Sequence, residues 1–329
     1  MSSMPEGDVL AALGALDLFE GAPPAVLERL AAVARPFSLA AGEYLFHEGD
    51  PGDRMMLLAS GSVEGILRLP GGRELEAQSL GHGALIGEMG MLASHPRRLS
   101  ARASVATAGW SFAAAEIGQL GATEVPAVMR RVGRLALERL REHYELLSEL
   151  CREDPRAEGS SRSAELDDAG PVVVVEREPE ETAYLETVLF FSAFSPAEIE
   201  ELFGDLRRLE APRGAPVVPD SEQGPTLLIV LRGAVESSIR HGGLATRTRL
   251  AGPGRIVGHL NLLREGLTPV ASRARERSIL LEVPLDRVAQ IIERGDDTGR
   301  RFGRAVYADV VDALFEAQRP ISRLAAAGG

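Results

Sequence analysis

The hydrophobic pattern changes its period once within the first third of the chain. Residues 9–34 alternate apolar and polar positions at helical spacing, and Pro23-Pro24 stands where a helix would begin. From Phe37 the period becomes two, and short apolar segments are separated by glycine-rich turn signals. The strand-like segments are 44–46, 55–58, 63–69, 74–80 and 100–106. Many short strands at close spacing predict an antiparallel jelly-roll barrel.

A longer helical segment follows these strands, over residues 126–151. Its apolar positions recur at three-four spacing and form a narrow stripe, made of Leu137, Leu140, Tyr144, Leu147 and Cys151. Two interpretations remain open. The helix lies on the barrel, or it also pairs with a partner or with a second copy of itself, as in a homodimer through 126–151.

The second half of the chain repeats the first. Residues 152–171 are charged and contain serine and glycine, which predicts a flexible linker. Beyond them Gly42, Gly61 and Gly71 recur as Gly214, Gly233 and Gly243, always 172 residues later. We therefore predict a mainly β fold with flanking α-helices, built from two tandem jelly-roll barrel domains that each carry N-terminal and C-terminal helices. Their expected bounds are 9–151 and 172–329.

The candidate chemistry lies between Ile86 and Arg102. Gly87-Glu88 opens a short predicted helix, and Pro96-Arg97 closes it. An arginine fork forms charge-assisted hydrogen bonds with a phosphate, a carboxylate accepts from hydroxyls, and a helix start attracts an anion. These groups can hold one phosphate and one sugar. The second copy keeps Gly258 but has His259 and Val270 where Glu88 and Arg97 stand.

An ordered set of motifs supports this interpretation: Gly42-Glu43, Glu48-Gly49-Asp50, Asp53, Gly61-Ser62-Val63, and Gly87 to Leu92 followed by Pro96-Arg97. Together they resemble the cyclic-nucleotide-binding domain, the module of catabolite activator protein, the protein kinase A regulatory subunit and cyclic-nucleotide-gated channels. The resemblance covers residues 13–150, and more weakly 185–295.

The resemblance implies a role for each matching position. Arg97 would pair with the cyclic phosphate, and Glu88 would accept from the ribose 2′-hydroxyl. Gly87 and the amides near Met89 and Arg98 would line the phosphate pocket. The expected ligand-binding set is Gly87, Glu88, Met89, Arg97, Arg98, Leu99 and Ser100.

The sequence departs from the family just after the arginine. Small residues are usual there, whereas Arg98 and Leu99 follow here, so the bulk of Arg98 must point away or alter the pocket. A threonine directly after the arginine often accompanies cGMP preference in the family, and its absence favours cAMP over cGMP. The additional positive charge instead favours a ligand with a second phosphate, such as a cyclic dinucleotide.

Composition excludes several other functions. A formal charge of −12 opposes DNA binding, which needs clustered cations. All 36 basic residues are arginine, so a P-loop lysine and a Schiff-base lysine are absent. The six histidines show no metal-ligand spacing. Without a secretory signal, a spanning apolar run or a second cysteine, we expect a cytoplasmic protein that does not insert into membranes.

Three further residues have expected roles, and two of them, His259 and Tyr144, have two interpretations each. His259 is either a surviving ligand contact or a surface or loop histidine, and the second is simpler. Trp110 is expected in the core. Tyr144 lies where the family often places a lid over the base, although aromatic residues on a helix more commonly pack.

The expected function is a non-enzymatic cyclic-nucleotide sensor without catalytic residues, metal or cofactor. No recognition helix with basic reading residues follows the second barrel, so we expect the signal to leave through a protein partner or changed self-association. One alternative is a scaffold of two barrels that binds no nucleotide, and another is a cyclic-dinucleotide sensor. A cupin-like enzyme ranks last, because it needs clustered histidines.

Overall fold

The chain forms two compact units. The computed structural model describes residues 6–16, 19–20, 22–68, 74–93, 95–117, 124–153, 161–162, 170–218, 225–241, 244–264 and 269–327. The units are Met1–Gly133 and Arg134–Gly329, so their boundary falls inside one long helix, α5 (Glu124–Glu153). Among the described helices, none is both long and apolar enough to cross a bilayer.

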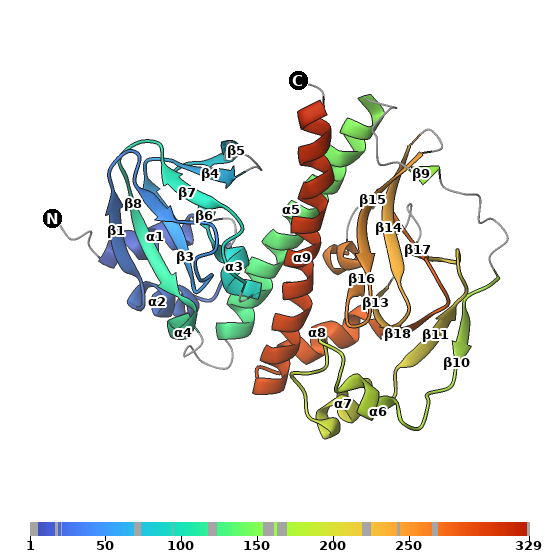
Figure 1. Ribbon diagram of the computed structural model, residues 1–329. Coiled ribbons are helices and arrows are strands. Elements are labelled where there is room, and N and C mark those ends of the chain that lie inside the picture. The colour runs from blue at the N-terminus through green and yellow to red at the C-terminus, as the bar shows by residue number, and fades with distance from the viewer. Residues whose placement is uncertain are drawn as a thin grey trace. The chain divides into compact units, whose positions relative to one another are not determined.

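The first unit contains a barrel of two antiparallel sheets, the first barrel (Figure 1). The sheets have the strand orders β1-β8-β3-β6 and β2-β7-β4-β5. The elements before α5 are α1 (Glu6–Gly14), α2 (Pro24–Ala32), β1 (Arg35–Leu39), β2 (Tyr44–Phe46), β3 (Arg54–Ser60), β4 (Val63–Arg68), β5 (Glu74–Leu80), β6 (Leu85–Ile86), α3 (Glu88–Ala93), β7 (Ser100–Ala103), β8 (Thr107–Ala113) and α4 (Ala114–Ile117). Pro24 is the first residue of α2, where its missing N–H costs no helical hydrogen bond.

The second unit contains the second barrel, with sheet orders β10-β11-β18-β13-β16 and β12-β17-β14-β15-β9. Its elements after α5 are β9 (Ser161–Arg162), β10 (Val173–Val175), α6 (Glu181–Leu185), α7 (Pro196–Phe203), β11 (Arg207–Ala211), β12 (Pro216–Val218), β13 (Thr226–Arg232), β14 (Val235–His241), β15 (Leu244–Ala251), β16 (Ile256–Val257), the 3-10 helix η2 (His259–Leu263), β17 (Val270–Ala274), β18 (Ser278–Pro284), α8 (Leu285–Glu293) and α9 (Asp297–Ala327). Ser195 starts α7 with a capping box to Glu198.

The two barrels have the same strand order, apart from β9 and β10, which each add an edge strand to the second. Registers also correspond: Met56 pairs with Ile86 in the first barrel, and Leu228 pairs with Val257 in the second. The predicted fold, two jelly-roll barrels with flanking helices, is therefore confirmed. The sequence offset extends to hydrogen-bond register because each copy meets the same turn and burial requirements.

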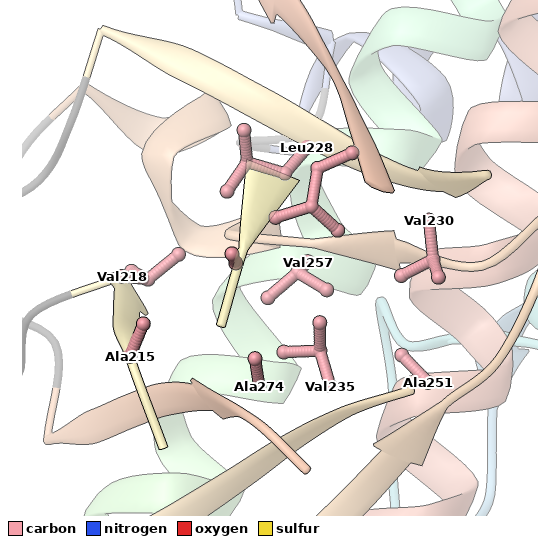
Figure 2. Close-up of a cluster of buried hydrophobic side chains, with 10 residues drawn as sticks. Ala215, Val218, Leu228, Val230, Val235, Ala251, Val257 and Ala274 are labelled. Carbon is pink, nitrogen blue, oxygen red and sulfur yellow. The ribbon is translucent and has the colours of Figure 1, made fainter. Parts of the chain in front are cut away.

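Equivalent apolar residues form the two cores. In the first barrel Leu58, Val63 and Ile86 belong to one buried cluster. In the second barrel the cluster includes Val230, Val235 and Val257, which converge between the two sheets (Figure 2). Burial of these side chains on the inner face of alternating strands holds each pair of sheets together. Trp110 is 3% exposed, which confirms its expected place in a core.

The linker predicted over 152–171 falls mostly on residues 154–160 and 163–169, which lie outside the described residues. Within it Ser161–Arg162 form β9, which pairs with Leu244 and Ala245 of β15. The expected stripe on α5 is buried within the chain. A homodimer through this stripe would require it to leave its present packing.

Candidate functional site

Arg97 is a buried arginine held by its own main chain beside the loop that follows β2. Its N–H donates to the carbonyl of Asp50 at 2.8 Å, and its carbonyl accepts from the N–H of Gly49 at 2.8 Å. The side chain is only 5% exposed. The turn signal around Gly49-Asp50 and the Pro96-Arg97 pair, far apart in the sequence, thus form one structural feature.

Two main-chain carbonyls hold the guanidinium of Arg97. Nη1 donates to the carbonyl oxygen of Gly87 at 2.7 Å, and Nη2 donates to that of Arg54 at 2.5 Å. Nε is buried and has no hydrogen-bond partner among the described residues. Because a guanidinium carries five N–H donors, three remain after these two bonds. Arg97 is fixed in position and keeps donors for an anion.

Phe46, the last residue of β2, lies beneath this guanidinium. The distance from Cζ of Arg97 to the ring centroid of Phe46 is 4.3 Å, within the range of a cation–π interaction. Phe46 also packs against the core cluster that includes Leu58 and Val63. The ring therefore connects the charged group to the rigid interior of the first barrel.

The backbone at Gly87 permits this arrangement. Gly87 has a φ of +81°, and a Cβ there would lie 2.4 Å from Nη1 of Arg97. Any side chain would meet both the strain of a left-handed conformation and a clash with the guanidinium. Glycine at this position is thus required by the close approach of Arg97.

The charges of nearby carboxylates partly offset the effect of burial on Arg97. Burial lowers the pKa of the Arg97 guanidinium from its ordinary value, and the charges of Asp53 and Glu88 oppose that effect. Glu88, the first residue of α3, is 1% exposed. A buried carboxylate and a buried guanidinium therefore lie within electrostatic range of each other.

The other residues of the expected ligand set have different environments. Met89 is buried in α3, Arg98 is exposed to solvent, and Leu99 is half-buried. Ser100 is buried at the start of β7, and its Oγ accepts from the N–H of Glu48 at 3.0 Å. The exposed Arg98 side chain agrees with the expectation that its bulk points away.

The second barrel replaces this arginine with a neutral donor that the sequence comparison did not reveal. Nδ2 of Asn261, in η2, donates to the carbonyl oxygen of Thr226 at 2.8 Å. Thr226 is the counterpart of Arg54 at the 172-residue offset. Asn261 also lies near Gly258, whose φ is +84° and whose Cβ would be 3.0 Å from Nδ2. An amide thus occupies the structural position of the guanidinium.

The interpretation of His259 as a surface or loop histidine is wrong. Its side chain is 6% exposed, and Nε2 lies 2.8 Å from Oδ2 of Asp309 in α9. Asp309 also accepts from Nη2 of Arg249 at 2.8 Å and from the N–H of Ile256 at 3.0 Å. His259 and Asp309 are 50 residues apart in the sequence, so no local motif indicated that they form a pair.

Tyr144 belongs to the second unit and lines a cavity of the second barrel. The sequence offered it either as a lid over the base in the first barrel or as a packing residue. Its side chain is 5% exposed, which agrees with the packing interpretation. Within the described residues, no cluster of three or more His, Cys, Asp or Glu could hold a metal ion.

Comparison with known proteins gives the following matches. Residues 36–124 and 208–295 each match the cyclic nucleotide-binding domain family, and together they make up more than half of the chain. The acetyltransferase Pat of Mycolicibacterium smegmatis is 31% identical over 132 residues, which are 39% of this chain and 38% of Pat. The CRP-like cAMP-activated global transcriptional regulator of Mycobacterium tuberculosis is 33% identical over 94 residues, 29% of this chain and 41% of the regulator.

Several solved structures align with 90% or more of the chain. The regulatory domain of Toxoplasma gondii PKA with cAMP is 16% identical, with a TM-score of 0.36, and the alignment covers 90% of this chain and 95% of that one. The two curated relatives above are matched over about two fifths of their own length.

Proposed function

Because the chain belongs to the cyclic nucleotide-binding domain family, we propose that its first barrel is a cyclic-nucleotide sensor that prefers cAMP to cGMP. Arg97 binds the cyclic phosphate, and Glu88 accepts from the ribose 2′-hydroxyl. Gly87, Met89, Arg98, Leu99 and Ser100 form the surrounding wall. The protein has a regulatory role and catalyses no reaction.

This proposal rests on which N–H groups of the Arg97 guanidinium have hydrogen-bond partners. Two of its N–H groups are held by the carbonyls of Gly87 and Arg54, and Nε is buried with no hydrogen-bond partner among the described residues. A buried donor without an acceptor costs free energy, which an incoming phosphate oxygen recovers. Since the guanidinium is already oriented, little additional ordering is needed on binding.

The second barrel supports the same assignment as an internal comparison. It keeps the positive-φ glycine, Gly258, and supplies Asn261 for the bond to the Thr226 carbonyl. It has Val270 and His259 where Arg97 and Glu88 stand. The second barrel therefore keeps the backbone arrangement without the two charged groups, and the first barrel has both.

The preference for cAMP has two supports. Arg98, rather than threonine, follows Arg97. The Mycobacterium tuberculosis relative is described as cAMP-activated. The output is a protein partner or a changed self-association, and we expect no DNA binding because the net charge is −12.

Isothermal titration of the full chain tests the proposal with cAMP, cGMP, a cyclic dinucleotide and the non-cyclic control 5′-AMP. We expect one site per chain for cAMP, weaker binding of cGMP and no heat from 5′-AMP. Absence of heat from every cyclic ligand at high protein concentration would overturn the sensor and favour a scaffold. Tightest binding of the cyclic dinucleotide would overturn the cAMP assignment.

A further inference from the structure

The second barrel contains a small cavity beside the segment that replaces the phosphate site. Its volume is about 20 Å³, and its walls include Gly258, which precedes η2, His259 of η2, Val218 of β12, Val270 of β17, and Tyr144 of α5. Ligand pockets typically have volumes of ~300–1,000 Å³. The remaining space is therefore far too small for a nucleotide.

Two valines mark this cavity as the counterpart of the Arg97 site. Val218 and Val270 correspond to Phe46 and Arg97, and both line the cavity. Val218 is also part of the apolar core (Figure 2). In the first barrel the Arg97 guanidinium lies over the Phe46 ring. The second barrel has two valine side chains at these positions, and such an apolar wall favours an uncharged occupant.

Tyr144 contributes an aromatic ring and a hydroxyl to this cavity. Burial raises the pKa of Tyr144 to about 12, and the side chain of Thr248 partly opposes that effect. Oγ1 of Thr248 donates to the carbonyl oxygen of Ser237 at 3.0 Å, and Ser237 lines the cavity together with Tyr144. Tyr144 of α5 therefore contributes to the wall of the second barrel.

A bulge in β15 turns Thr248 toward the interior of the second barrel. Ser237 pairs with Arg249 and Ser238 with Arg247, which leaves Thr248 between them without a partner in the ladder. Because a bulge turns two successive residues toward one face, Thr248 and Arg249 are both buried. Thr248 meets Tyr144, while Arg249 pairs with Asp309.

Other residues of α5 contact the same strand and the C-terminal helix. Sγ of Cys151 donates to Oγ1 of Thr246 in β15 at 3.3 Å. Nε2 of His143 lies 3.4 Å from the side-chain nitrogen of Gln318 in α9. Contacts therefore extend over more than two turns of α5, with Tyr144 between the other two positions.

We propose that the second barrel is an intramolecular receptor for α5, with Tyr144 as the resident occupant of the pocket that a ligand would use. Asp309 of α9 holds His259, which lines this pocket, through a contact of 2.8 Å between Oδ2 and Nε2. Since α5 begins in the first unit and enters the second at residue 134, occupancy of the pocket is coupled to the helix that follows the first barrel. The coupling to ligand binding rests on the proposed function. The proposal that the second barrel receives Tyr144 does not depend on it.

Cavity complementation tests the receptor without any nucleotide. Tyr144→Ala removes the occupant, and p-cresol supplies a free equivalent of the lost side chain. We expect faster amide hydrogen exchange over 134–153 and 259–263, on the order of a hundredfold, and a Tm that rises by about 3 °C when p-cresol is added.

The matched control is Leu147→Ala, one turn further along α5, where the side chain is 0% exposed but does not line the cavity. Its exchange should also rise, with no response to p-cresol. An equal response to p-cresol in both variants, or none in either, would overturn the receptor proposal and leave Tyr144 as an ordinary packing residue.

The coupling has a separate measurement, the affinity of the Tyr144→Ala chain for cAMP. Coupled sites change each other's affinity reciprocally, so we expect a change of about fivefold or more. Unchanged affinity would overturn the coupling alone. Failure of wild-type protein to bind any cyclic nucleotide would instead overturn the proposed function, while the p-cresol result would still decide the receptor.

Discussion

Asn261 donates through Nδ2 to the carbonyl oxygen of Thr226 at 2.8 Å, and this bond repeats in the second barrel the one between Arg97 and the Arg54 carbonyl in the first. A neutral amide therefore satisfies the same main-chain acceptor as a guanidinium. Both barrels have a side-chain donor for this main-chain carbonyl. Only in the first barrel does that donor carry a positive charge. Binding and stability should respond separately to mutation.

Asn261→Ala is expected to weaken the second barrel without affecting ligand binding in the first. It removes the donor from the Thr226 carbonyl, and an acceptor left unsatisfied in a buried environment costs about 1–3 kcal/mol. Urea denaturation measures the free energy of unfolding, and titration with cAMP measures affinity. A stable variant that has lost cAMP binding would contradict the separation of the two roles.

Phe46→Leu should weaken cAMP binding because the Arg97 guanidinium loses the ring beneath it. The interaction between a cation and an aromatic ring is worth about 0.5–2 kcal/mol, which corresponds to a loss of roughly 2-fold to 30-fold in affinity. Phe37→Leu is the matched control, since Phe37 packs against the same core cluster as Phe46. Equal effects of the two substitutions on affinity would refute a positioning role for Phe46.

Gly87→Ala is expected to abolish cAMP binding, whereas Gly83→Ala should only reduce stability. Both glycines have positive φ, +81° and +79°, so both variants incur about 1–2 kcal/mol of backbone strain. Only at Gly87 does the new Cβ meet the guanidinium of Arg97. A Cβ on Gly83 meets no heavy atom within 4 Å. Thermal unfolding of the two variants measures the cost of backbone strain, and titration with cAMP measures the effect of displacing Arg97.

The pH dependence of stability should reveal the buried pair of His259 and Asp309. Burial lowers the pKa of His259 below its ordinary value; the hydrogen bond to Asp309 opposes this effect, and the charge of Arg249 reinforces it. The unfolded chain therefore takes up a proton on this histidine at a higher pH than the folded chain. The free energy of unfolding should fall as the pH drops below about 6.5, by up to about 1.4 kcal/mol per pH unit for one such group.

His259→Gln keeps an N–H donor for Asp309 but does not titrate, so it should reduce the loss of stability between pH 7.5 and 5.5 by about 1 kcal/mol. His143, whose pKa is also lowered by burial, should account for part of the remaining loss. Asp309 acts at lower pH. Burial raises the pKa of Asp309, but Arg249 and His259 together outweigh that effect and hold the pKa of the carboxyl below its ordinary value. Its contribution is therefore lost only as the pH falls through that lowered pKa. Identical urea midpoints for wild type and His259→Gln at both pH values would contradict this account.

The sequence predicted the architecture because the repeat is carried by local requirements. Gly42 and Gly214 both have a φ of +86°, so the same turn demands glycine in both copies. The alternation of apolar residues gives both the strands and their inner faces, as Leu58 and Val230 illustrate. Patterns of this kind are visible along a single chain without knowledge of its tertiary contacts.

The parts that sequence reasoning missed depend on side chains that meet only in three dimensions. Phe46 looks like any strand residue, and its position under Arg97 has no local signal. His259 contacts Asp309 of α9, which follows β17 and β18 in the sequence. Tyr144 lies on the helix that follows the first barrel, yet it lines a cavity of the second. Aligning the two copies does identify Val218, at an offset of 172, and Val270, at an offset of 173, as a joint replacement of Phe46 and Arg97, once those two are known to be in contact.

The affinity of Arg97→Gln for cAMP, measured by isothermal titration beside Arg98→Gln, tests the central claim most directly. Gln at position 97 keeps a donor for the Arg54 carbonyl, as Asn261 does for Thr226, so the barrel should remain folded by circular dichroism. Two charge-assisted hydrogen bonds at ~1.5–3 kcal/mol each predict a loss of roughly a hundredfold or more for Arg97→Gln. Arg98 contributes its main-chain amide to the proposed site, and Arg98→Gln keeps that amide, so loss of the exposed side-chain charge should matter little. Wild-type affinity in a folded Arg97→Gln chain would contradict the account.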